Sequence, residues 1–301
     1  MKSGVINLLK PPGMTSSDAV LQVRRLFGQK RVGHTGTLDP GAAGVLPICI
    51  GRATRLFDYL VDKDKVYIAE IRFGAATDTQ DSYGQPVWQA DTAVTADMLS
   101  ERLPDFLGEQ EQIAPMYSAV KSGGKKLYEL ARAGAAPVEK RRRVTIHALE
   151  LLEQTGGQSF LLRVACSRGT YVRTLCQDIG EALGAPAHLS FLLRCASGPF
   201  LVEEAWTLEE LWQLKEEGRL DAALLPADVV LSDLPEIRLS RGEEERRLRN
   251  GAVVFPAGWE EFPQGLPLRT YGTEGFLGLS RADKTGLHLI LCLEDERKTD
   301  E

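Results

Sequence analysis

Apolar and polar positions along this 301-residue chain follow two distinct periods. Residues 65–73 alternate apolar and polar side chains, which is the pattern of a half-buried strand. After Thr15 or Ser16, apolar residues instead recur on one side of a helix that stops at Gly28. Further strands are predicted at residues 4–9, 142–152, 159–167, 275–281 and 286–293, and further helices at 51–62, 95–107, 126–133, 170–183 and 207–218.

Glycine- and proline-rich residues 29–47 interrupt these periods and predict a long loop. Because helices and strands mix without a regular β-α alternation, we predict an α+β fold with a mixed, largely antiparallel sheet. An acidic, proline-containing stretch at Ser232–Pro235 predicts a boundary between a domain of residues 1–234 and a small, β-rich domain of residues 235–301.

The amino-acid composition limits which classes of protein this chain can belong to. Hydrophobic residues make up 43% of the chain and charged residues 26%, as in ordinary globular domains. The five cysteines are odd in number and lack C-x-x-C spacing, and the four histidines are scattered, so we expect neither a disulfide framework nor a metal site. The N-terminus does not resemble a signal peptide, and apolar runs fall short of the roughly 20 residues that span a bilayer, which predicts a cytoplasmic protein without a membrane partner.

Charge is unevenly distributed along the chain. The formal net charge is -6, which taken alone argues against nucleic acid as a partner. Residues 121–143, however, contain eight Lys or Arg and two Glu, and residues 2–31 contain six basic residues and one Asp. A basic face on an acidic protein can bind RNA, but clustered surface charge without function explains the same pattern.

The most informative segment is residues 33–41, with the sequence GHTGTLDPG. Its glycines leave space beside Asp39, and Pro40 favours an extended conformation of that residue. An Asp in such a turn usually bonds its own backbone, so the segment alone does not establish a catalytic group. Arg31 and Arg52 flank the loop and could face a phosphate backbone. Neither the Walker motif nor the dinucleotide fingerprint is present.

Five segments together are more specific than any one of them. In this order they resemble the motifs of bacterial tRNA pseudouridine-55 synthases, the TruB family: KPPGMTSSD at 10–18, GHTGTLDPGAAGVLP at 33–47, KVY at 65–67, APMYSAVKSGGKKLYELAR at 114–132 and CSRGTYVRTL at 166–175.

This resemblance implies a pseudouridine-synthase core in residues 1–234, with an insertion at about 114–147 that grips the RNA arm. It also implies that residues 235–301 form a PUA-like RNA-binding domain. The expected activity is conversion of uridine to pseudouridine at position 55 in the T arm of tRNA. It implies a monomer that needs neither a cofactor nor an obligatory protein partner.

The resemblance also assigns site residues. Asp39 matches the catalytic aspartate, Tyr67 the aromatic residue that stacks on the target base, and Arg173 the arginine that pairs with the carboxylate. We expect Arg173 to lower the pKa of Asp39. The remaining matches line the pocket or contact the substrate: His34, Tyr171, Leu192 and Arg55.

Arg55 stands where some members carry lysine, which keeps the positive charge but changes the donor geometry.

Several alternatives remain open from the sequence. Asp39 could attack C1′ of the ribose or remove the 2′ proton to give a glycal. Other hypotheses are the guide-RNA-dependent branch of the same family and an RNA-folding protein without catalysis. A small-molecule hydrolase is disfavoured because no second carboxylate stands at a defined spacing from Asp39.

Overall fold

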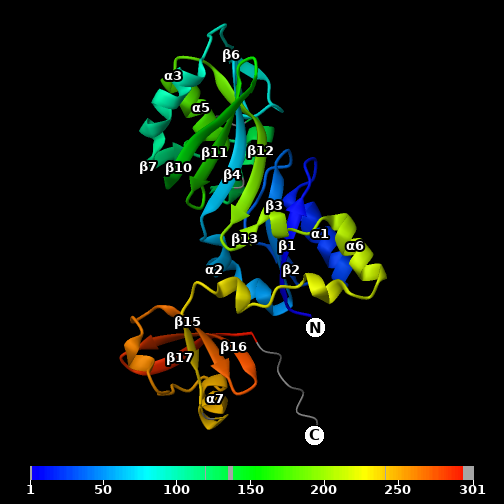
Figure 1. The fold of residues 1–301 in the computed structure, drawn as a ribbon, viewed down its shortest axis with the longest axis vertical. Coiled ribbons are helices and arrows are strands. Elements are labelled where there is room, and N and C mark those ends of the chain that lie inside the picture. The colour runs from blue at the N-terminus through cyan, green and yellow to red at the C-terminus, as the bar shows by residue number, and fades with distance from the viewer. Residues whose placement is uncertain (1, 119, 135–137, 241, 294–301) are drawn as a thin grey trace.

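The computed structural model describes residues 2–118, 120–134, 138–240 and 242–293. Within these ranges the chain forms a large nine-stranded sheet, a four-stranded sheet near the C-terminus and two short hairpins. Figure 1 shows the large sheet in the upper part of the molecule and the C-terminal sheet below it. None of the helices in these ranges is both long and apolar enough to cross a lipid bilayer.

The large sheet is mixed and mostly antiparallel, as predicted. Only the pairing of β12 with β3 is parallel. In spatial order the strands are β1 (Gly4–Lys10), β3 (Ala43–Ile50), β12 (Ala187–Ser197), β4 (Lys65–Phe73), β11 (Ser159–Cys166), β10 (Arg141–Gly156) and β7 (Gly108–Ile113). Two short strands join its edges: β2 (Val32–His34) pairs with β3, and β13 (Phe200–Leu201) pairs with β12.

Helices cover the sheet where their apolar stripes face it. Helix α1 (Ser16–Phe27) begins at a capping box between Thr15 and Asp18 and ends at Gly28, whose φ of 61° suits glycine. Helix α5 (Val172–Ala182) packs against β12 and β4. The other α-helices are α2 (Phe57–Val61), α3 (Ala96–Arg102), α4 (Leu127–Arg132), α6 (Leu208–Glu216) and α7 (Gly242–Arg249).

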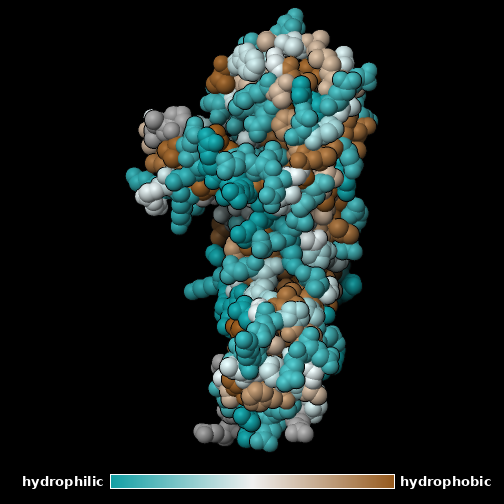
Figure 2. Space-filling view, turned by 90° about the vertical axis from the view of Figure 1, so that its left-hand side faces the viewer, coloured by the Kyte–Doolittle hydropathy of each residue, from teal (hydrophilic) through white to brown (hydrophobic). Residues whose placement is uncertain are grey.

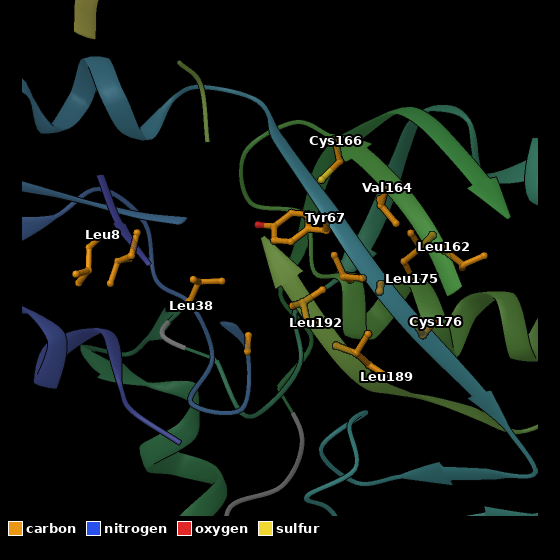
Figure 3. Close-up of a cluster of buried hydrophobic side chains, with 14 of the residues drawn as sticks. Leu8, Leu38, Tyr67, Leu162, Val164, Cys166, Leu175, Cys176, Leu189 and Leu192 are labelled. Carbon is orange, nitrogen blue, oxygen red and sulfur yellow. The ribbon is translucent and has the colours of Figure 1, made fainter. Parts of the chain in front are cut away.

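The main core lies between this sheet and the helices. Phe160, Leu162 and Leu175 are fully buried in it. Figure 3 shows Tyr67 in the same cluster, close to Leu192. Strand β4 therefore has the predicted alternation, with its apolar face inside.

A second, four-stranded sheet forms the C-terminal part of the described chain. Its strands are β14 (Glu236–Arg238), β15 (Pro267–Gly272), β16 (Gly275–Asp283) and β17 (Gly286–Cys292), in that order. The predicted strands at 275–281 and 286–293 are therefore present, while residues 294–301 lie outside the described residues. The PUA-like character of this part and the boundary at residue 234 stay predictions.

Several elements differ from the sequence-based expectation. Part of the predicted loop at residues 29–47 forms β2 and the start of β3. Strand β3 is buried on both faces, so its apolar residues do not alternate with polar ones and give no strand period. Strand β7, with the sequence GEQEQI, is a mostly exposed edge strand and lacks an apolar face to signal it.

Two short hairpins lie outside the large sheet. The first joins β5 (Ala75–Thr77) to β6 (Pro86–Gln89). The second joins β8 (Lys121–Ser122) to β9 (Lys125–Lys126), just before α4, within the predicted insertion at 114–147; residues 119 and 135–137 of that insertion lie outside the described residues. The face of the molecule in Figure 2 is mostly hydrophilic, with small hydrophobic areas between polar side chains.

Candidate active site

A pocket of about 680 Å³ lies where the two hairpins meet the large sheet. Its wall includes the N-terminus of α1, the loop between β2 and β3, the β5–β6 turn, the insertion and the start of α5. Asp39, His34, Arg173 and Leu192 all line it. This volume is in the range of ordinary small-molecule sites, about 300–1,000 Å³.

The loop that carries Asp39 is held rigidly on both sides. The Leu38 N–H donates to the Ser16 hydroxyl at 2.9 Å, and this hydroxyl donates to the Leu38 carbonyl at 3.0 Å. The Gly13 N–H donates to the Pro40 carbonyl at 2.8 Å. Because both neighbours of Asp39 are fixed in this way, the carboxylate has a defined position before substrate binds.

Lys10 contacts the same loop from its buried side. Its side chain is fully buried, and its ammonium donates to the carbonyls of Met14 at 2.7 Å and Pro40 at 3.4 Å. Burial lowers the pKa of Lys10 to about 8, although the Asp39 charge opposes the change.

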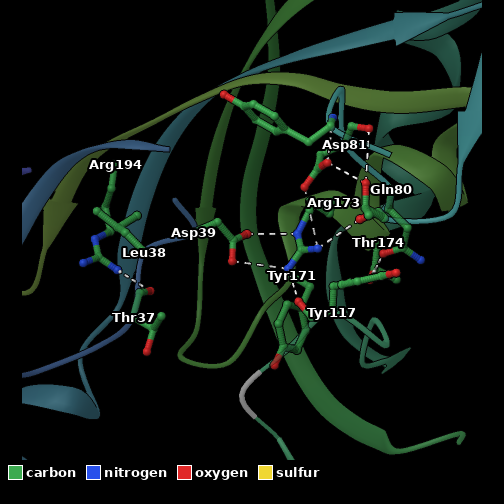
Figure 4. A network of polar contacts seen from close by, with 12 residues as sticks. Thr37, Leu38, Asp39, Gln80, Asp81, Tyr117, Tyr171, Arg173, Thr174 and Arg194 are labelled. Atoms are coloured by element: carbon green, nitrogen blue, oxygen red, sulfur yellow. Dashed lines mark hydrogen bonds and ion pairs between the residues drawn. The ribbon is translucent and has the colours of Figure 1, made fainter. Parts of the chain in front are cut away.

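Asp39 forms a two-pronged ion pair with Arg173. The distances are 2.9 Å from Arg173 Nε to Asp39 Oδ2 and 3.3 Å from Nη2 to Oδ1 (Figure 4). The Asp39 side chain keeps 39% of its exposure, whereas that of Arg173 keeps 4%. The carboxylate is therefore oriented by the arginine and still open to the pocket.

Arg173 is itself fixed by the surrounding main chain. It lies at the start of α5, and its guanidinium donates to the carbonyls of Thr79 and Tyr117, each at 2.9 Å. Asp81 Oδ2 lies 3.8 Å from Nη1. Arg173 thus connects the Asp39 loop, the β5–β6 hairpin and the insertion.

The electrostatics of Asp39 combine opposing effects. Burial raises the pKa of its carboxyl above the usual value of 3.8, Arg173 lowers it, and the neighbouring Asp81 raises it. Arg173 acts in the predicted direction, but burial outweighs it, so the pKa of Asp39 is raised overall.

Tyr67 lies beneath the pocket rather than on its surface. Its side chain is 8% exposed, and Figure 3 shows its ring in the buried cluster, just above Leu192. Burial raises the pKa of the phenol, so the hydroxyl stays protonated. Stacking of Tyr67 on a base therefore requires the base to enter deeply, next to Leu192.

His34 faces the pocket as a neutral side chain. Its Nδ1 accepts the Gly36 N–H at 3.3 Å, and burial followed by the Arg194 charge lowers its pKa. In the neutral tautomer the proton is then on Nε2, which suits a donor that positions a base.

Like Tyr67, two further predicted residues lie away from the pocket lining. Tyr171 caps the start of α5, and the Arg142 guanidinium lies 5.3 Å from its ring centroid. Arg55 donates to the Cys292 carbonyl at 2.9 Å, in the C-terminal part. Substrate roles for Tyr171 and Arg55 stay predictions.

Some residues around the pocket were not singled out from the sequence. Asp81 follows a turn, and nothing in its local sequence distinguishes it from a surface aspartate. Lys10 belonged to a quoted motif, but a lysine before two prolines gives no sign of burial. The pocket lining also contains aromatic residues from separate segments: Tyr83, Tyr117, Tyr128 and Phe191.

Metal binding has no visible basis in this region. Among the residues that the structure describes, histidine, cysteine, aspartate and glutamate side chains form no cluster of three or more that could hold a metal ion. The Asp39 carboxylate, held by Arg173 with Asp81 nearby, is suited to attack or proton removal on a sugar ring.

Comparison with known families identifies the class. Residues 24–172 match the model of the TruB family pseudouridylate synthase N-terminal domain. Residues 173–232 match that of the tRNA pseudouridylate synthase B C-terminal domain. Both matches end before residue 235.

Individual relatives agree with this class. The chain is 52% identical to tRNA pseudouridine synthase B of Symbiobacterium thermophilum, over 84% of this chain and 83% of that one. It is 42% identical to the protein of the same name in Pelotomaculum thermopropionicum, over 94% and 92%. A chain from the crystal structure of a Cbf5-Nop10-Gar1 complex matches with a TM-score of 0.72 and 28% identity, over 97% of this chain and 84% of that chain.

The site and these matches define a pseudouridylate synthase. The chain belongs to the TruB family of these enzymes.

Proposed function

We propose that this protein converts uridine to pseudouridine at position 55 in the T arm of tRNA, with Asp39 as the catalytic carboxylate. The observation that carries the proposal is the Asp39–Arg173 ion pair at 2.9 Å on the wall of a pocket of about 680 Å³. The curated relatives at 42% and 52% identity are named tRNA pseudouridine synthase B, which supports tRNA as the substrate.

The reaction breaks one bond, forms another and keeps every atom. The N1–C1′ bond of uridine breaks, and its electron pair leaves with the base. Ionised Asp39 either bonds to C1′ or takes the 2′ proton to give a glycal. The base then turns and forms the C5–C1′ bond. On the first route the bond between Asp39 and C1′ breaks as this bond forms, and on the second Asp39 returns its proton to C2′. C5 finally loses a proton and N1 gains one.

The target base must leave the RNA stack to reach Asp39. Flipping costs a few kcal/mol, and less for bases in loops. Stacking on an aromatic ring returns about 1–3 kcal/mol per base, which Tyr67 supplies in this proposal. Leu192 bounds the pocket on its apolar side, and His34 donates a hydrogen bond that orients the base.

The rest of the RNA is bound outside the pocket. In this proposal the basic insertion at 114–147 contacts the backbone of the T arm, and the C-terminal domain acts as a PUA-like RNA-binding module. Such phosphate contacts make affinity dependent on salt. We further expect a monomer that acts in the cytoplasm without an obligatory protein partner or cofactor.

The test uses the full-length chain, an unmodified tRNA transcript and buffer alone. The wild-type chain is expected to produce pseudouridine at position 55, and Asp39→Asn is expected to abolish product while tRNA affinity changes less than about threefold. Asp58→Asn serves as a control, because Asp58 is an exposed carboxylate on α2.

Two outcomes would contradict the proposal. Tight tRNA binding by the wild type without any pseudouridine would indicate an RNA-folding protein. Full activity of Asp39→Asn would remove that carboxylate from the chemistry.

A further inference from the structure

We propose that Arg194 is a positioning residue of this active site, which holds the Asp39 loop and Tyr67 in one fixed arrangement. This inference rests on the function proposed above. Arg194 lies on β12 directly opposite Tyr67 on β4, and its side chain is 1% exposed. It cannot contact RNA from this position, so any effect on the reaction must pass through its neighbours.

The guanidinium binds the main chain at both ends of the Asp39 loop. Its Nη2 donates to the Gly36 carbonyl at 3.2 Å and its Nη1 to the Thr37 carbonyl at 3.4 Å, before Asp39. Its Nε donates to the Val45 carbonyl at 2.7 Å, after Asp39. A single side chain thus closes the base of the loop that presents the carboxylate.

Glycines allow the loop to approach this strand. The φ angle of Gly44 is +117°, and a Cβ added there would lie 2.6 Å from the Arg194 amide nitrogen. A Cβ added at Gly36 would have Arg194 Nη1 as its nearest neighbour, at 3.8 Å. The loop and β12 are therefore matched in shape as well as in hydrogen bonding.

Arg194 also lies beside Tyr67, because the two residues are a cross-strand pair on neighbouring strands of the sheet. Its positive charge lowers the pKa of the Tyr67 hydroxyl, against the larger effect of burial, which raises it. The Tyr67 ring and the Asp39 loop therefore lie next to the same buried side chain, and we infer that this side chain sets the distance between the base-stacking surface and the carboxylate.

Burial of the Arg194 guanidinium costs free energy unless its N–H groups find hydrogen-bond partners. Among the residues that the structure describes, no carboxylate forms an ion pair with Arg194, and its hydrogen bonds go to main-chain carbonyls. Burial of a cation without an anion is unfavourable. Lysine would keep the charge but lose the fork of donors that reaches several carbonyls at once.

The two arginines near Asp39 have different tasks. Figure 4 shows Arg194 and Arg173 on opposite sides of Asp39. Arg173 contacts the carboxylate itself, whereas Arg194 contacts the backbone that carries it. Loss of Arg194 should therefore misplace the carboxylate without removing any group that binds RNA.

The test compares Arg194→Lys with the wild type by single-turnover isomerisation and by tRNA affinity. A displacement of about 1 Å in a catalytic group costs on the order of 100-fold in rate. We expect a rate loss of about 10- to 100-fold for Arg194→Lys, with a tRNA Kd within about twofold of the wild type. The matched control is Arg163→Lys on β11, on the other side of β4 from β12, where the arginine is 40% exposed and pairs with Glu150.

A double-mutant cycle addresses the link to Tyr67. If Arg194 acts partly through this hydroxyl, the losses in Arg194→Lys and Tyr67→Phe are not additive, and the double variant is faster than the product of the two effects requires. Tyr67→Phe retains the ring and the core packing, so this arm does not depend on a disruptive variant.

Three results would overturn the inference: an unchanged rate in Arg194→Lys, an equal loss of rate and tRNA affinity, or a fully additive cycle. Failure of the wild type to form pseudouridine would instead reject the proposed function, so the two failures are distinguishable.

Discussion

The Asp39 side chain is open to the pocket, yet its surroundings raise the pKa of its carboxyl and so disfavour ionisation. Burial favours the protonated acid, while Arg173 and Lys10 favour the carboxylate. The proposed reaction needs the carboxylate, because a protonated acid can neither bond to C1′ nor take the 2′ proton. Arg173 therefore has an electrostatic task in addition to orienting the group.

The raised pKa of Asp39 predicts the acid side of the rate profile. The rate is full above the pKa of Asp39 in the folded protein and is lost as pH falls through it. Since that pKa is raised, the loss should begin above the usual aspartate value of 3.8. Arg173→Gln removes the cation that lowers the pKa, so its acid midpoint should move further up in pH.

The measurement for this prediction is single-turnover rate against pH, with tRNA affinity followed at each pH. We also expect Arg173→Gln to lower the rate more than the affinity. A midpoint that moves down in pH, or equal loss of rate and affinity, would mean that Arg173 serves mainly as a phosphate contact.

Among the elements, the connection from β2 to β3 carries Asp39, the proposed catalytic residue. It is tied to α1 through Ser16, to Lys10 on β1 and to Arg194 on β12. Its glycines are needed at defined places, but for different reasons. Gly44 has a positive φ of 117° and backbone directly beside it, whereas Gly41 faces only the ring of Tyr83.

This difference predicts unequal costs for two similar substitutions. Gly44→Ala forces the backbones of β3 and β12 apart and places a side chain at positive φ, so we expect a loss of about 2–4 kcal/mol in the free energy of unfolding. Gly41→Ala meets the Tyr83 ring, which is 75% exposed and can rotate away, so we expect a change within about 1 kcal/mol.

Urea denaturation of the two variants beside the wild type checks this pair. Equal losses in both would show that the contact between Gly44 and Arg194 imposes no special constraint on the fold.

For the whole molecule, the junction between the two sheets is apolar. Leu279 and Leu291 from the C-terminal sheet share a buried cluster with Val45 and Cys49 of β3. Strand β3 thus has the Asp39 loop at its start and packs against residues of the C-terminal sheet. Figure 1 shows this sheet below the lower end of the large sheet.

Because the two sheets share a buried apolar cluster, we expect them to unfold together. We expect one calorimetric transition for the wild type, and Leu279→Ala should shift it downward by a loss of about 2–5 kcal/mol, because Leu279 is fully buried. Leu201→Ala is the control, since Leu201 is 43% exposed and should change stability by less than about 0.5 kcal/mol. Two separate transitions, with Leu279→Ala moving only one, would contradict this.

Local sequence patterns were enough to predict several strands, helices and turns of this protein. The alternation at residues 65–73, the capped helix after Thr15 and the glycine-rich turn around Asp39 each depend on neighbours within a few positions. Such patterns reflect local backbone preferences and one-sided burial, which act over short distances along the chain.

The assembly of the site and the burial of its residues depend on long-range packing, which local sequence does not reveal. Asp39 and Arg173 are 134 residues apart in sequence, yet their side chains meet because α5 and the β2–β3 loop pack beside the same sheet. Strand β3 is buried on both faces and β12 pairs with strands from distant segments, so no local period revealed either strand or the burial of Arg194. Burial and charge environment sum over the whole chain, and the raised pKa of Asp39 therefore followed only from the packed structure.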